Sequence, residues 1–209
     1  LGANTTNDSS IAIGHESQQS STADFNTSVG STALQTNTSG TRNSAFGAEA
    51  LLSNTEGNDN VGVGYDSLVF NTTGSGSVAV GKNALRANTT ASGNVAIGHD
   101  AGKSITTGNQ SVFIGQYAGD AVTTASENTF IGAYSGTKVT TGQGNTALGR
   151  TSLSNLTTGS NNIAIGGDAL EKATTSGQNI AVGGLAGAEI TTGGYNTNIG
   201  YAAGRNTTT

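Results

Sequence analysis

Hydrophobic and polar residues alternate along this chain in an order that returns about every 17 residues. Residues 94–98 show the order: one asparagine, the three apolar residues Val-Ala-Ile, and a glycine. We number each repeat from that glycine as position 0. The first interval between these glycines is 16 residues and the other ten are 17. A fixed period of this length is typical of stacked structural repeats. The twelve position-0 glycines are Gly14, Gly30, Gly47, Gly64, Gly81, Gly98, Gly115, Gly132, Gly149, Gly166, Gly183 and Gly200.

The apolar positions of each repeat predict a β-strand. Position −1 is apolar in all twelve repeats, and position −3 is mostly Val, Ile or Thr. Two such residues separated by one residue point to the same side of a strand, and we expect that side to be the inside of a coil. A second turn is expected at Thr-Thr-Gly, for example at 72–74 and 106–108. Each repeat is therefore predicted to hold two short strands and two turns.

These patterns predict an all-β fold: one parallel β-solenoid, or β-roll, of about twelve 17-residue coils over residues 1–209. Position −4 is Asn or Ser in every repeat, for example Asn94 and Asn128, and stacked Asn side chains can hydrogen-bond from coil to coil. Positions +4 and +7 exchange: Leu85 goes with Asn88, whereas Gly102 goes with Ile105. The exchange predicts that both positions reach one core site with room for one large side chain.

Position −2 lies between the two residues that we place inside, so we expect it to face outward. A solvated strand face would be polar there, but the column is mostly alanine. A small apolar stripe along a rod predicts a contact between chains, and hence a side-by-side homotrimer. The alternative is that alanine is simply tolerated on a surface. The expected interface residues are Ala12, Ala45, Ala79, Ala96, Phe113, Phe130, Ala147, Ala164 and Ala181.

The composition supports a stack and excludes several functional classes. Proline is absent, as expected where every backbone N–H is needed by the next coil. The net charge is −5 and the eight basic residues are scattered, so we expect no nucleic-acid partner. The sequence contains no run of 18 apolar residues, so we expect no membrane insertion. Because the chain starts at Leu1 rather than at Met, we expect a fragment or a processed product.

The repeat resembles that of trimeric autotransporter adhesin heads. The resemblance is carried by residues 94–98 followed by Ala101, and by residues 77–81 followed by Ala84. The longer form, residues 162–166 followed by Ala169 and Leu170, resembles repeats of phage tail fibres. The resemblance implies a left-handed parallel β-roll with three chains side by side. It also implies an extracellular location, on a cell surface or in a virion fibre, and binding to host surfaces.

Three acidic residues form the one candidate metal site. Glu49, Asp66 and Asp100 all fall at position +2 within four consecutive repeats, the third of which has Asn83 there. Coils about 4.8 Å apart would bring Glu49 and Asp66 together, which suits a calcium ridge or a glycosidase pair. A solvated acidic edge is the favoured interpretation, since no motif supplies a cleft. We therefore expect no enzyme and no cofactor, with Ca²⁺ as the weak exception.

Aromatic residues gather in two adjacent repeats. Phe113 and Phe130 fall at position −2, and Tyr117 and Tyr134 fall at position +2. One interpretation is an adaptation of packing at the contact between chains. The other is a surface patch formed by Tyr117 and Tyr134 that binds a glycan or a protein.

The predicted function is a structural segment of an extracellular fibre or adhesin. It would project from a cell or virion and attach to surface glycans or proteins. The alternative is a purely structural subunit of a filament that stacks solenoids head to tail. A remote alternative is ice binding, suggested by the repeated Thr-Thr column.

Overall fold

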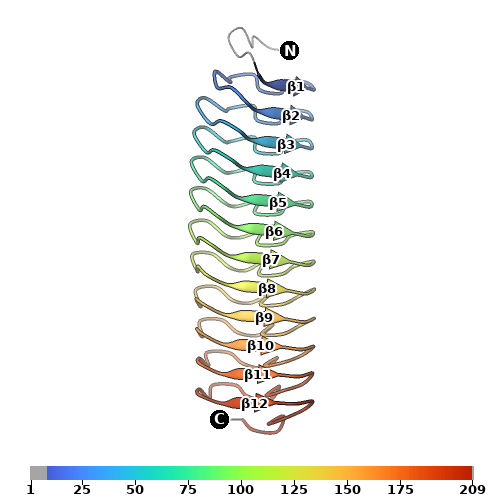
Figure 1. Cartoon of the computed structure of the whole chain (residues 1–209), viewed down its shortest axis with the longest axis vertical. Helices are drawn as coiled ribbons and strands as arrows, with labels where there is room; N and C mark the ends of the chain where they lie inside the picture. The colour runs from blue at the N-terminus through green and yellow to red at the C-terminus, as the bar shows by residue number, and fades with distance from the viewer. Residues whose placement is uncertain (1–8, 209) are drawn as a thin grey trace.

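The chain forms a straight stack of coils in its computed structural model, which describes residues 9–208. Each coil contributes one three-residue strand, and the strand arrows lie one above another in sequence order (Figure 1). All neighbouring strands pair in parallel, in the order β1 to β12, to form one twelve-stranded sheet. The register advances by one repeat at each step, for example from Ala79 to Ala96. The strands are β1 (Ile11–Ile13), β2 (Thr27–Val29), β3 (Ser44–Phe46), β4 (Val61–Val63), β5 (Val78–Val80), β6 (Val95–Ile97), β7 (Val112–Ile114), β8 (Thr129–Ile131), β9 (Thr146–Leu148), β10 (Ile163–Ile165), β11 (Ile180–Val182) and β12 (Thr197–Ile199).

The prediction of an all-β parallel solenoid with a 17-residue repeat is confirmed, but the second strand per coil is wrong. Outside the strands, each described coil consists of turns. The reason is the backbone, which enters the left-handed region at positions +2, +4 and +12. Tyr117, Gly119 and Gln110 show this with φ of 56°, 59° and 56°. Such residues interrupt an extended chain, so only positions −3 to −1 remain as strand.

The predicted orientation of the strands is also wrong. In β6 the middle residue Ala96 is fully buried, whereas Ile97 is 40% exposed. Position −2 thus faces the core, and positions −3 and −1 face outward. The interior in front of the sheet is narrow: a Cβ added to Gly62 would lie 3.5 Å from Leu51 Cδ1. Only a small residue fits there while leucine fills the remaining width.

The predicted interface column therefore belongs to the core of a single chain. Its members cannot form a side-chain contact with a second chain because the coil itself covers them. Ala12, in the first strand, is half-buried, and the others are fully buried. The residues corrected in this way are Ala12, Ala45, Ala79, Ala96, Phe113, Phe130, Ala147, Ala164 and Ala181.

The predicted asparagine ladder at position −4 is confirmed. The Asn94 side chain accepts a hydrogen bond from the Ser111 backbone N–H at 2.9 Å and donates to the Gly108 carbonyl at 2.8 Å. A column of threonines at position +8 adds a second ladder. The hydroxyl of Thr72, for example, donates to the Thr89 carbonyl at 2.9 Å. These two ladders pair polar groups of neighbouring coils, which ties each coil to the next.

The position-0 glycine brings two coils close together. Gly98 has a φ of 135°, and a Cβ added there would lie 2.6 Å from the carbonyl oxygen of Gly115 in the next coil. No other residue type satisfies both the backbone angle and the spacing. The repeated glycine thus sets the edge of the rod at the carboxyl ends of the strands.

Candidate functional site

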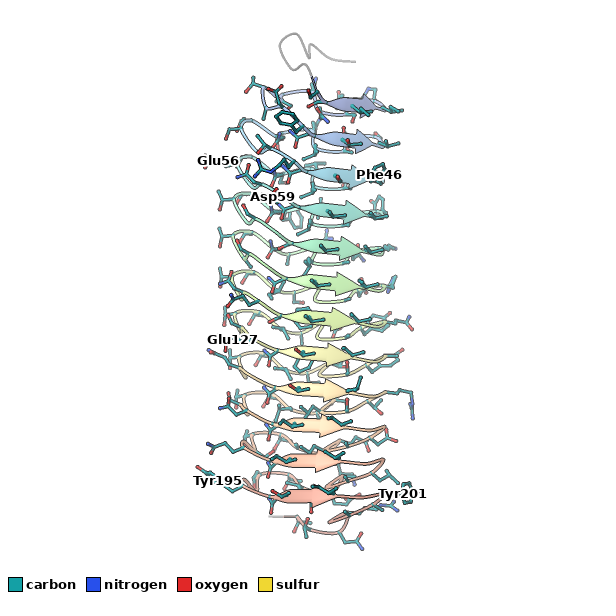
Figure 2. The ribbon with its side chains drawn as sticks, in the orientation of Figure 1. Phe46, Glu56, Asp59, Glu127, Tyr195 and Tyr201 are labelled. Carbon is teal, nitrogen blue, oxygen red and sulfur yellow. The ribbon has the colours of Figure 1, made fainter. Side chains whose placement is uncertain are left out.

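The outer face of the sheet carries a strip of twelve apolar side chains, one at position −1 of each strand. The column beside it, at position −3, holds five Ser or Thr residues among its twelve, and none of the 24 residues of the two columns carries a charge. Ile97, Leu148 and Ile163 are 40%, 44% and 38% exposed. Figure 2 shows one such side chain, Phe46, at the sheet. A strip of apolar side chains that runs the length of the sheet at position −1 is the mark of an interaction surface.

A second surface lies at the edge of the rod beyond the carboxyl ends of the strands. Tyr201, at position +1, marks this edge in Figure 2, opposite Glu56 and Glu127 at the threonine turns. In each coil the backbone N–H of position +2 donates to the carbonyl of position +1 in the preceding coil. Tyr134 N–H donates in this way to Gln116 at 2.9 Å. The edge is therefore a regular column of side chains on a fixed backbone.

Aromatic rings stack along this edge. Tyr117 and Tyr134 have ring centroids 5.3 Å apart and planes inclined by 28°. The His99 ring lies 5.5 Å from Tyr117 in an edge-on arrangement of 78°. Tyr134 is 42% exposed. We call His99, Tyr117 and Tyr134 the aromatic ladder. Tyr134 is the most exposed of these three residues.

The aromatic residues that cluster in the sequence separate in the structure. Phe113 and Phe130 are fully buried in the core, with ring centroids 5.8 Å apart. Tyr117 and Tyr134 belong to the edge instead. The two phenylalanines thus serve packing inside one chain, and the two tyrosines remain the candidate for surface binding. His99 was not expected in this group because its role depends on the tilt of the neighbouring ring.

Two of the three acidic residues proposed as calcium ligands, Asp66 and Asp100, lie close to cations or an amide. Asp66 lies 3.4 Å from Arg86. Asp100 accepts a hydrogen bond from Asn83 at 2.7 Å and lies 3.5 Å from Lys103. Within residues 9–208, no three His, Cys, Asp or Glu side chains group closely enough to hold a metal ion. The geometry therefore gives the calcium hypothesis for Glu49, Asp66 and Asp100 no support.

Electrostatics at this edge vary from coil to coil. The negative charges of Asp66 and then Glu49 raise the pKa of the Tyr65 phenol. Burial raises the pKa of the Asp120 carboxyl, while the positive charge of Lys103 opposes that shift. Loss of hydration disfavours an ionised carboxylate, which explains the direction. Asp120 Oδ1 is buried and accepts no hydrogen bond from any described residue.

One polar cluster that the repeat pattern did not indicate follows the aromatic ladder. The Thr151 hydroxyl hydrogen-bonds to Asp168 Oδ1, and an Arg150 guanidinium nitrogen lies 3.8 Å from the same oxygen. The Arg150 side chain is 70% exposed. Thr151 occupies position +2, in the coil that follows Tyr134. Its place in the tyrosine column was visible in the repeat alignment, but its bond to Asp168 was not.

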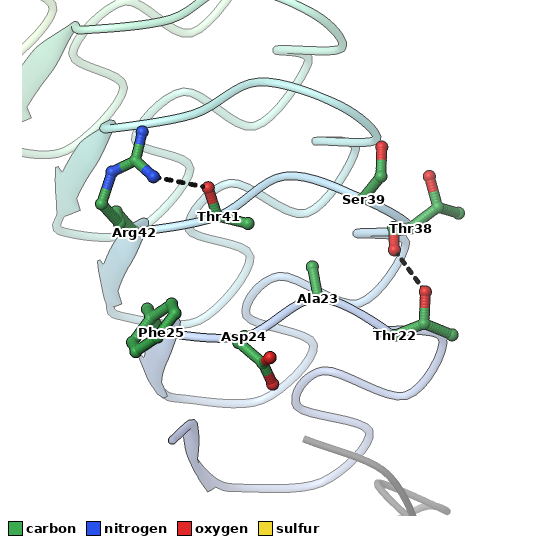
Figure 3. A pocket seen from close by; sticks show the side chains of 8 residues that line it. All are labelled: Thr22, Ala23, Asp24, Phe25, Thr38, Ser39, Thr41 and Arg42. Atoms are coloured by element: carbon green, nitrogen blue, oxygen red, sulfur yellow. Dashed lines mark hydrogen bonds between the residues drawn. The ribbon is translucent and has the colours of Figure 1, made fainter. Parts of the chain in front are cut away.

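A shallow pocket lies where the first repeat is one residue short (Figure 3). Its lining comes from a turn of that repeat, with Thr22 and Asp24, and from the turn stacked on it, with Thr38 and Ser39. The cavity measures about 360 Å³. Its guanidinium, Arg42, already holds both carboxylate oxygens of Asp59, at 2.6 and 2.8 Å. The pocket therefore has no unpaired cation to offer a ligand, and we assign it none.

Comparisons with known proteins do not identify a function, so the function has to be inferred from these surfaces. No family model, curated protein or solved structure matches the chain. Among the described residues, no helix has the length and apolar character needed to cross a bilayer.

Proposed function

We propose that the chain is a segment of an extracellular fibre in which three copies lie side by side and in parallel. The observation that carries the proposal is the outer sheet face, with its 24 uncharged positions in two straight columns. The strip of apolar side chains at position −1 gains most free energy when a matching apolar surface covers it. The same strip on a second and third copy is matched in length and spacing by symmetry.

The stack suits a projecting role. Backbone hydrogen bonds join each pair of neighbouring strands, and the asparagine and threonine ladders add side-chain bonds to the same joints. With coils about 4.8 Å apart, twelve coils make a rod roughly 55 Å long. Such a rod transmits position and force without internal hinges. In this arrangement the fibre attaches to its target through exposed columns of side chains away from the sheet face. The aromatic ladder is such a column, and its rings stack on one another.

Sedimentation equilibrium of the purified chain tests the trimer. We expect three times the mass of one chain. The double variant Val95→Asp/Ile97→Asp places charges in the middle of the outer face and should give a folded monomer, because buried unpaired charges oppose association. Thr107→Asp, on the exposed turn, is the matched control and should remain trimeric. A monomeric parent chain at high concentration would contradict the proposal.

A further variant separates this interface from the one expected from the sequence. Ala96→Asp puts the same charge into the core, so it should unfold the chain rather than dissociate it. Electron microscopy of the native assembly distinguishes the two structural roles. Discrete fibres on a cell or virion support the adhesive segment, and continuous filaments of stacked rods support the structural subunit.

A further inference from the structure

We infer that the exposed face of Tyr134 is a binding subsite for an uncharged pyranose sugar, bounded by Thr151, Arg150 and Asp168. This inference deepens the proposed function, since it names the chemistry that the fibre would recognise. It rests on three features: a ring with one open face, a narrow residue in the next coil, and a charge-neutral polar cluster beside it.

The first feature is the asymmetry of the aromatic ladder. Tyr117 has two ring neighbours, Tyr134 stacked on it and His99 in an edge-on arrangement. Tyr134 has one ring neighbour among the described residues, and it is 42% exposed. The stack therefore offers a ligand one ring face, that of Tyr134 away from Tyr117. Sugars bind aromatic faces through the C–H groups on one side of the pyranose, which makes that side apolar.

The second feature is the change of side-chain size along position +2. The column passes from two tyrosines to Thr151, which reaches only far enough to bond Asp168. Coils repeat about every 4.8 Å, which is close to the separation of stacked rings. A flat sugar ring lying on Tyr134 would continue the ladder by one step. It would occupy the space beside Thr151 that the ring of a third tyrosine in this column would fill.

The third feature is the chemistry around that place. Asp168 offers carboxylate acceptors and Arg150 offers a guanidinium with several donors, and the two lie 3.8 Å apart. Neighbouring sugar hydroxyls both donate and accept, so they match a mixed pair of this kind. The pair is neutral as a unit and the chain carries a net charge of −5. These charges favour a neutral sugar over a sialylated or sulfated one.

The ligand is tested with methyl β-galactoside, methyl β-glucoside and N-acetylglucosamine, and with sialic acid as the charged comparison. Saturation-transfer NMR should show transfer to ring protons of at least one neutral sugar, with a Kd on the order of 1 mM. The chain has five tyrosines and no tryptophan, so tyrosine fluorescence gives a second readout.

Variants locate the site. Tyr134→Ala should weaken binding about fivefold to tenfold through loss of stacking. Thr151→Tyr should abolish binding, because the new ring takes the place of the sugar. This change is tolerable for the backbone, since Thr151, Tyr117 and Tyr134 have φ of 56°, 56° and 60°. Tyr65→Ala and Tyr195→Ala, which remove exposed rings outside the ladder, should bind like the parent chain.

The subsite is overturned if no neutral sugar binds even when its concentration is raised well above the millimolar range, or if only sialic acid binds. It is also overturned if Tyr134→Ala and Thr151→Tyr bind as the parent chain does while their circular dichroism shows that they are folded. Failure here leaves the trimer intact, because sedimentation measures that separately. Conversely, a monomeric chain that still binds a neutral sugar refutes the trimer and supports the subsite. In a trimer, three subsites at the same height would strengthen attachment to a surface bearing many glycans.

Discussion

Two regions of the rod fill the same coil width in different ways. The leucine coils carry Leu34, Leu51, Leu68 and Leu85 at position +4, with a buried asparagine at +7. The glycine coils carry Gly102, Gly119 and Gly136 at +4, with Ile105, Val122 and Val139 at +7. The strand register does not change between them. A coil of fixed outline therefore admits two sets of core residues that are each matched internally.

The difference between the two kinds of coil shows which core residues depend on one another. In the glycine coils the rings of Phe113 and Phe130 occupy the space that leucine takes elsewhere. A Cβ added to Gly119 would lie 2.4 Å from Phe113 Cδ1, and one added to Gly136 would lie 2.5 Å from Phe130 Cδ2. At Gly119 and Gly136, glycine is thus required by the phenylalanine at position −2 of the same coil, in addition to the aliphatic residue at +7 that the sequence indicated.

The boundary between the regions leaves a mark in the polar core. Asn54, Asn71 and Asn88 form a ladder in which each amide donates to the carbonyl oxygen of the preceding asparagine, at 2.9, 2.7 and 2.7 Å. The next coil has Ile105 in that column, which has no donor. Asn88 Oδ1 accordingly is buried and has no hydrogen-bond partner among the described residues. The switch between core types carries a local cost in hydrogen bonding.

The largest effect is expected for Phe113→Ala. Gly102 and Gly119 face the ring, and neither has a side chain that could fill the cavity left behind. We expect the free energy of unfolding to fall by about 3–5 kcal/mol. Urea denaturation followed by circular dichroism measures the change. A loss below about 1 kcal/mol would mean that the coil collapses around the cavity.

Gly119→Leu should be the next most damaging, by about 2–3 kcal/mol, because the new side chain overlaps the ring of Phe113. Leu85 adopts a φ of 50° at the same position, so the backbone accepts leucine. The double variant Gly119→Leu/Phe113→Ala should therefore be more stable than either single variant. Additive losses in the double variant would disprove the idea of one shared core volume.

Asn71→Ala interrupts the ladder of the leucine coils. It removes the acceptor for Asn88 and the donor for Asn54, all inside the core. We expect a loss of about 1–2 kcal/mol from the polar groups left unpaired. The control Asn109→Ala lies on the exposed turn and should cost less. Equal melting temperatures for both variants would show that the ladder adds no more than surface asparagines do.

The smallest effect concerns position +5, which is the buried Val69 in one leucine coil and Asp120 in one glycine coil. Burial raises the pKa of Asp120, so the folded chain holds its proton to higher pH than the unfolded chain does. Stability should therefore fall as the pH rises from about 4 through the raised pKa. Asp120→Asn should remove this slope and slightly stabilise the chain at neutral pH. An unchanged pH profile of the melting temperature would contradict the assignment.

The sequence by itself determined the stack. The recurring glycine at position 0 and the polar residue at position −4 lie in fixed columns, and only stacked coils bring such columns together. Gly98 against Gly115 and Asn94 against Ser111 are contacts of this kind. The exchange at +4 and +7 was also visible, because a core of constant width limits the volume of each coil.

Only the tertiary structure decided which side of each strand faces the core. Alternation with a period of two places Val95 and Ile97 on one face and Ala96 on the other, but it does not say which face lies inside. The face that lies inside depends on which side chains the rest of the coil packs against the sheet. In the leucine coils the leucine fills the interior, so the small residue at position −2 turns inward, whereas in two glycine coils Phe113 and Phe130 at position −2 fill it themselves. In both cases the aliphatic residues at positions −3 and −1 turn outward. The stacking of His99, Tyr117 and Tyr134 likewise depends on side-chain angles that the repeat pattern does not contain.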